Sequence, residues 1–160
     1  MRTTRRRLEK QEDPSVKNPQ LTNKLIICFI LWMDPLFDHE KLDVYCLELG
    51  FVAWLAAFFD DASHWSARHR RELIGQLDRA SRSVFLNMAE GNGQRQGQQR
   101  AKFFEDARGS AFECAACLDA SVAKGFVSID RVRPGKEMLA RVVAMLTRLI
   151  DRFDTNSRTS

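Results

Sequence analysis

The cysteines and glycines have the spacings most easily linked to chemistry. Cys114 and Cys117 are separated by two residues, as in half of a structural zinc site. Such a site needs four ligands, commonly two such pairs, and Cys28 and Cys46 do not form a second pair. We therefore expect Cys114 and Cys117 to be small core residues, and we expect no metal. The cysteine spacing does not resemble a secreted disulfide framework, so we expect reduced thiols and a cytoplasmic protein.

Three glycines, Gly91, Gly93 and Gly97, resemble a phosphate-binding loop only superficially. A dinucleotide-binding fingerprint has a different spacing and follows a strand, whereas these glycines follow a helical pattern. A helix end and a flexible turn are the better interpretation, with Gly91 in the left-handed conformation just after the helix. The histidines are scattered and form no motif with neighbouring acids, at His39, His64 and His69. We expect no catalytic site and no cofactor; an enzyme using the polar residues around this turn is the least favoured alternative.

Basic side chains form the one surface with an evident binding chemistry. Residues 68–102 hold eight Arg or Lys and three acids, and four of the arginines fall within about 80° of one another on the expected helix: Arg68, Arg71, Arg79 and Arg82. Guanidinium groups bind phosphates, so RNA or DNA is the expected ligand. Two alternatives are a solvated face and docking on the acidic segment 34–61 of a neighbouring copy. The expected nucleic-acid-binding residues are Arg68, Arg71, Arg79, Arg82, Arg95, Arg100 and Lys102.

The formal net charge of +4 belongs to the N-terminal segment, because residues 34–160 carry equal numbers of acids and bases. Residues 1–34 read as a basic leader that is disordered or forms a short helix. Its apolar run, 25–33, is shorter than the roughly 20 residues that cross a membrane, and no cleavage site follows it. We expect no membrane partner. Met33 is a candidate natural start.

The rest of the chain predicts an all-α fold, an antiparallel up-down-up-down four-helix bundle over residues 35–155 with a frayed tail at 156–160. Pro134 and Gly135 are expected to kink the last helix or to restart it near Lys136. Helices are expected over about 38–60, 68–90, 98–124 and 128–154. The core stripe expected on the second helix consists of Leu73, Leu77, Ala80, Val84 and Met88. The core stripe expected on the third helix consists of Phe103, Ala107, Ser110, Cys114, Cys117, Leu118 and Ser121.

The first of these helices is apolar on almost every side between Leu42 and Phe59. A bundle covers one stripe of each helix, so a second copy of the chain is the simplest cover for the rest. The alternative is cover by the leader or by the loop 61–67. The expected oligomer interface consists of Leu47, Phe51, Trp54, Phe58 and Phe112.

Two segments carry a resemblance to a known family. The segment 83–91, Ser-Val-Phe-Leu-Asn-Met-Ala-Glu-Gly, resembles the Ser-Ile-Pro-Ala-Asn-Ile-Ala-Glu-Gly signature of four-helix-bundle proteins encoded in 23S ribosomal RNA intervening sequences. The segment 107–113 matches their second signature, Ala-Arg-Gly-Ser-x-x-Glu, and 42–45 resembles their opening. Phe85 stands where the signature has proline. The resemblance covers about residues 38–154.

This family is similar to the accessory variability determinant of diversity-generating retroelements. That resemblance implies a homopentamer with a positively charged surface, nucleic acid and a reverse transcriptase as partners, and no enzymatic activity. A purely structural oligomer is the alternative. From their positions in the two signatures and at a helix end, six residues are expected to fix the helix register and the turn between the middle helices. These are Asn87, Glu90, Gly91, Gly109, Ser110 and Glu113.

Overall fold

The computed structural model describes residues 34–60 and 67–158, so the predictions on the leader and on the loop 61–66 lie outside the described residues. A short 3-10 helix, η2 (Asp38–Lys41), precedes four α-helices. These are α2 (Asp43–Asp60), α3 (Ala67–Gly93), α4 (Gly97–Ala123) and α5 (Ile129–Arg158). The all-α class and the four predicted helices are confirmed.

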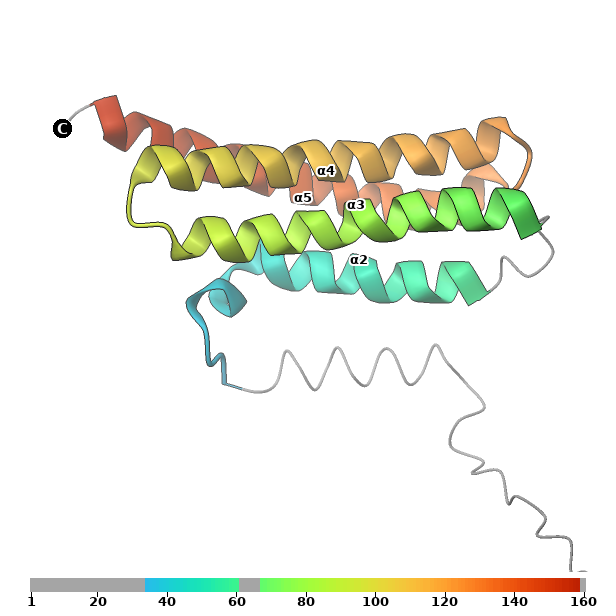
Figure 1. Cartoon of the computed structure of the whole chain (residues 1–160), viewed down its shortest axis with the longest axis horizontal. Coiled ribbons are helices and arrows are strands. Elements are labelled where there is room, and N and C mark those ends of the chain that lie inside the picture. Colours follow the sequence, from blue (N-terminus) through green and yellow to red (C-terminus); the bar gives the residue numbers. More distant parts are fainter. Residues whose placement is uncertain (1–33, 61–66, 159–160) are drawn as a thin grey trace, which may run out of the picture.

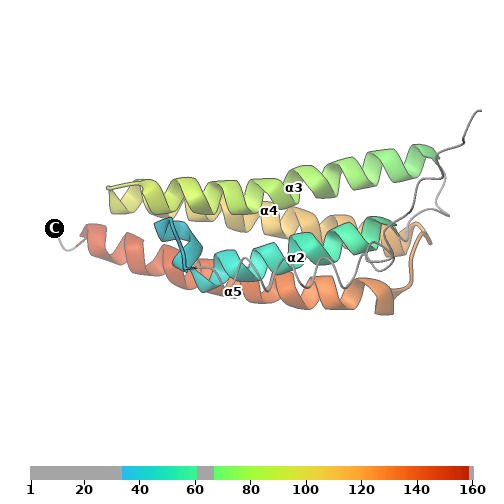
Figure 2. The same ribbon diagram turned by 90° about the horizontal axis from the view of Figure 1, so that it is seen from below.

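The helices form an elongated antiparallel bundle (Figure 1). In this bundle α4 lies between α3 and α5, while α2 contacts α3 and α5 on the opposite side. The view from below shows α2 running alongside α5 (Figure 2). Short turns make sequence neighbours antiparallel, as expected for an up-down-up-down order. No helix in the described part of the chain has the length and apolar character needed to cross a lipid bilayer.

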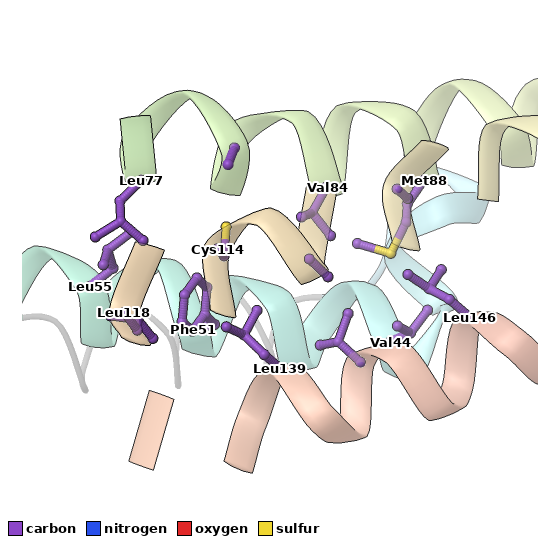
Figure 3. Packing of buried hydrophobic residues seen from close by; sticks show 14 of the residues in the cluster. Val44, Phe51, Leu55, Leu77, Val84, Met88, Cys114, Leu118, Leu139 and Leu146 are labelled. Atoms are coloured by element: carbon purple, nitrogen blue, oxygen red, sulfur yellow. The ribbon is translucent and has the colours of Figure 1, made fainter. Parts of the chain in front are cut away.

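The core consists of one apolar stripe from each helix, because side chains three and four residues apart share a helix face. On α3 this stripe contains all the residues expected from the sequence, including Leu77, Val84 and Met88. On α4 it is rotated relative to the expectation: Phe104 and Ala111 are buried, whereas Phe103 and Ser110 lie at its edge. Figure 3 shows how the four stripes meet. Side chains that meet there include Phe51, Leu55, Leu77, Cys114, Leu118, Leu139 and Leu146.

The turn between α4 and α5 contains the left-handed glycine of the described chain. Gly125 has φ +70°, its N–H donates to the Val122 carbonyl at 2.9 Å, and the Phe126 N–H donates to the Ser121 carbonyl at 2.9 Å. These two bonds satisfy carbonyls that a helix end leaves unpaired, and the positive φ favours glycine.

Two helix ends differ from the sequence prediction. Gly91 does not end α3: the helix continues to Gly93, and Gly91 has no positive φ. Pro134 does not restart the last helix, because α5 is continuous from Ile129 and contains this proline. It also ends at Arg158, beyond the predicted end near Asp154.

Candidate nucleic-acid interface

A chain of hydrogen bonds joins α3 to α4 along one side of the bundle. Asn87 Nδ2 donates to Ser83 Oγ at 3.1 Å, and the hydroxyls of Ser83 and Ser110 lie 2.9 Å apart. Ser110 Oγ in turn donates to the Asp106 carbonyl at 3.0 Å. Each hydroxyl can therefore donate once and accept once, which satisfies both groups between the helices. We call these residues, together with Gln76 and Glu113, the polar seam.

The second part of the polar seam is a separate set of hydrogen bonds that also joins α3 to α4 and includes one of the exposed arginines. Gln76 Nε2 donates to Glu113 Oε1, and Arg79 Nη2 donates to Gln76 Oε1. The two family-like segments meet across α3 and α4 at the contact between Ser83 and Ser110. Asn87 and Ser110 belong to the first set of hydrogen bonds, and Glu113 belongs to the second. Glu90 is exposed and makes no hydrogen bond to any other described residue, so the structure gives it no place in this network.

The two signature glycines have different surroundings. Gly91 is buried where α3 and α4 approach each other closely. A Cβ added at Gly91 would lie 2.8 Å from Phe103 Cβ and 3.4 Å from the Arg100 carbonyl oxygen, so glycine is required there by space and not by a left-handed turn. Gly109 is exposed, and a Cβ added there would meet no atom within 4 Å. Nothing in the part of the chain that the structure describes explains the glycine at 109.

Arg100, expected to bind nucleic acid, instead holds the turn between α3 and α4. Its Nη2 donates to the carbonyls of Asn92 at 3.0 Å and Gln94 at 2.7 Å. Its guanidinium carbon also lies 4.8 Å from the centre of the Phe153 ring on α5. A guanidinium that caps carbonyls at the end of a helix and lies against an aromatic ring is engaged by the protein itself. The prediction for Arg100 is therefore corrected.

The other expected cations lie on the surface. Arg79 and Arg82 are exposed, and Arg82 forms an exposed ion pair with Asp78 at 3.0 Å, which contributes little to stability. The side chain of Arg68 lies outside the described residues. Three further cations are exposed and make no bond or ion pair with the rest of the described chain: Arg71, Arg95 and Lys102.

The expected oligomer surface is partly core. Phe51 and Phe58 are 0% and 3% exposed, so they are buried within the chain and do not form an outer surface. Trp54 stacks between them, with ring centroids 5.7 Å from Phe51 and 5.1 Å from Phe58. Leu47 is half-buried against the same core. Of the five expected residues, Phe112 alone exposes more than half of its side chain, 56%.

The thiols and histidines assemble no reaction centre among the described residues. Cys46, Cys114 and Cys117 are free thiols, and no group of three or more metal-ligating side chains occurs in the described part of the chain. Cys114 is buried in the core, where burial raises the pKa of its thiol and keeps it protonated. His39 packs against Tyr45, with ring centroids 4.8 Å apart.

Sequence reasoning missed one chemically unusual residue. Glu48 on α2 is completely buried, and neither of its carboxyl oxygens has a hydrogen-bond partner among the described residues. Burial raises its pKa to about 9, so the carboxyl is neutral at pH 7. The signal was present in the sequence, because Glu48 shares helical spacing with Val44, Phe51 and Leu55. It also means that the acidic segment 34–61 has less surface charge than its composition indicates.

Fold and seam together define a small antiparallel four-helix bundle whose middle helices are joined by polar contacts and carry exposed cations. The family model of the 23S rRNA-intervening sequence protein matches residues 41–148, which span α2, α3, α4 and most of α5. The chain belongs to this family. No curated protein matches it.

Proposed function

We propose that this protein is a non-catalytic nucleic-acid-binding protein that contacts phosphates through the exposed cations of α3, of the α3–α4 turn and of the N-terminal part of α4. The observation that carries the proposal is the set of exposed cations that the fold does not use internally. Arg71 on α3, Arg95 in the turn and Lys102 on α4 have no partner in the described chain. Arg79 and Arg82 on α3 are also exposed, although they contact Gln76 and Asp78. A rise of 1.5 Å per residue separates Arg71 from Arg82 by about 16 Å, which spans several phosphates.

The family name supports RNA as the ligand, and ribosomal RNA in particular. A reverse transcriptase is the second candidate partner, and this prediction rests on the resemblance to the retroelement accessory protein. The prediction of a homopentamer rests on the same resemblance. Both the reverse-transcriptase partner and the homopentamer therefore remain predictions. The competing function is a structural oligomer in which the basic face docks on the acidic segment of a neighbouring copy. Burial of Glu48 weakens that alternative, because it removes one of the seven acids from the surface.

The test is a quadruple variant, R71Q/R79Q/R82Q/R95Q, titrated against labelled RNA and DNA at several salt concentrations. We expect wild-type binding to weaken steeply with added salt, and the variant to lose at least about tenfold in affinity with a smaller salt slope. The matched control is R133Q/R141Q/R148Q/R152Q, which removes the same charge from exposed positions of α5.

The control variant should keep most of the wild-type affinity. Equal losses in the two variants would show that only net charge matters and would contradict the assigned surface. Dissociation of an oligomer by the α3 variant, with no nucleic-acid binding by the wild type, would favour the structural alternative.

A further inference from the structure

A pocket lies beside the α3–α4 turn, and most of its lining comes from the N-terminal part of α4. It has a volume of about 380 Å³ and is lined by Gln94, Gln99, Lys102, Phe103 and Asp106, which we call the turn pocket. This volume lies within the range of about 300–1,000 Å³ that small ligands occupy. The pocket lies next to the polar seam, because the carbonyl of Asp106 accepts the hydrogen bond from Ser110.

The lining of the turn pocket combines one aromatic ring with four polar side chains. None of the side chains of Gln94, Gln99, Lys102 and Asp106 has a hydrogen bond or ion pair within the described chain. Their donors and acceptors are thus available to a ligand. A planar aromatic group with polar edges fits such a lining better than an aliphatic ligand, because it can stack on Phe103 and form hydrogen bonds around its edge.

The surrounding structure holds the turn pocket in place. The absence of a side chain at Gly91 lets α3 approach Phe103 directly, with no room for a Cβ. The Gln94 carbonyl accepts from Arg100, and the Gln94 N–H donates to the Gly91 carbonyl at 3.1 Å. The ring and the turn backbone are therefore fixed from both helices, which reduces the ordering cost of binding.

We propose that the turn pocket binds one unpaired nucleobase that carries an exocyclic amino group, stacked on Phe103 with Asp106 accepting from that amino group. Lys102 then lies near the adjoining phosphate, and the side-chain amides of Gln94 and Gln99 form hydrogen bonds with the remaining polar edge of the base. This inference rests on the proposed nucleic-acid binding and makes it specific to single-stranded segments, whose bases are free to leave the stack.

Asp106 determines which base is accepted. A carboxylate accepts from the N4 amino group of cytosine but faces an oxygen acceptor at the same position in uracil or thymine. Cytosine and uracil are otherwise similar in size. The proposal therefore predicts discrimination between two pyrimidines that a purely electrostatic surface would bind equally.

The experiment compares the binding of oligocytidylate and oligouridylate of equal length to the full chain at one salt concentration, followed by fluorescence anisotropy. We expect the wild type to prefer oligocytidylate by about fivefold or more. Asp106→Asn should bring the two affinities close together, because its amide presents either a donor or an acceptor. Glu105→Gln is the matched control, since it removes the same charge from the next residue and should keep the preference.

A second pair of variants tests stacking. Phe103→Leu should weaken the binding of both oligonucleotides by about fivefold or more, whereas Phe112→Leu, the same change at an exposed site, should leave both affinities unchanged. Circular dichroism and thermal unfolding of each variant identify any loss of fold. Asp106 is exposed, so its variant carries the test even if Phe103→Leu is unstable.

The outcomes separate the two proposals. Salt-dependent binding with equal affinity for both oligonucleotides, or the same behaviour in Asp106→Asn and Glu105→Gln, would overturn the turn pocket as a base site and leave the basic surface standing. No binding of any RNA or DNA by the wild type would overturn the proposed function and the pocket assignment with it.

Discussion

At the scale of the residue, the most consequential group is Glu48, whose buried carboxyl has no hydrogen-bond partner among the described residues. Ionising it there would place a charge where neither water nor a donor compensates it, so the neutral form is favoured. Its electrostatic influence reaches Cys114 on α4, where it adds to the burial that already raises the pKa of that thiol. The protonation state of this one side chain thus links the pH of the solution to the stability of the packing around α2.

The pH dependence of stability follows from the sign of this shift. The pKa of Glu48 rises from 4.5 to about 9 on folding, so between these values the folded state holds a proton that the unfolded state has lost. The contribution of Glu48 is fully present below about pH 4.5 and is lost as pH rises towards about 9, by up to about 1.4 kcal/mol per pH unit. Urea unfolding of wild type and Glu48→Gln across this range measures the difference.

We expect the Glu48→Gln variant to lose this part of the slope, because its side chain does not ionise. The exposed Glu105→Gln variant should retain it. Parallel pH profiles for wild type and Glu48→Gln would show that the carboxyl is hydrated or ionised in the folded chain. Glu48→Leu should raise stability at pH 7, because an apolar side chain replaces an unsatisfied polar one.

At the scale of the element, close contacts between helices decide features that local sequence patterns leave open. Gly91 follows a glutamate at the end of an apolar stripe, so the sequence predicts a helix cap there. In the structure, glycine is required because Phe103 on the next helix leaves no room for a Cβ. Pro134 predicts a kink or a restart of the last helix, yet α5 is continuous through this residue. Beside it, the Trp54 ring of α2 lies against Gly135, so close that a Cβ at 135 would come within 2.2 Å of the ring.

Gly135→Ala should therefore destabilise the protein by about 1–3 kcal/mol, because overpacking forces Trp54 away from α5. Alanine in place of an interior helical glycine ordinarily stabilises by about 0.5–1 kcal/mol, so the expected sign is opposite to the intrinsic propensity. Gly50→Ala on α2 is the control, since a Cβ there would meet no atom within 4 Å, and it should not destabilise. Denaturant unfolding compares the two; a gain in stability for Gly135→Ala would contradict the packing of Trp54.

Sequence periodicity predicted the helix order and the core stripe of α3, because these depend on spacing along a single helix. It did not predict the role of Arg100 or the burial of Phe51 and Phe58. Arg100 is held by the carbonyls of Asn92 at the end of α3 and Gln94 in the turn, and by Phe153 on α5. These contacts depend on how three helices converge. The apolar character of α2 was evident, but which of its two wide faces lies in the core is decided by α3 and α5.

At the scale of the whole molecule, the single chain closes its own core. The chain itself buries Phe51 and Phe58 of α2, which the sequence assigned to a partner, and partly buries Trp54. Of the five residues expected at the oligomer interface, Phe112 on α4 is the exposed one, at 56%. The bare Gly109 lies three residues before it, on the same part of the helix surface. An interface between copies is therefore expected on α4 instead of on the buried side of α2.

Phe112→Ser should weaken self-association without unfolding the protomer, because it removes an exposed apolar anchor from this surface. Sedimentation across a range of concentrations measures the effect. Leu86→Ser on α3 changes a side chain of similar exposure, 59%, and should leave the assembly intact. A wild-type chain that sediments as a monomer at every concentration, or equal effects of both variants, would contradict an α4 interface.

The shielded sulfur of Cys114 has a practical consequence. Alkylating reagents attack thiolates, and this thiol is both enclosed by the four helices and held in its protonated form. Modification at this position requires a transient separation of the helices, so its rate reports the free energy of that separation under native conditions. The natural chain therefore contains its own chemical reporter of breathing motions, with no attached dye or engineered label.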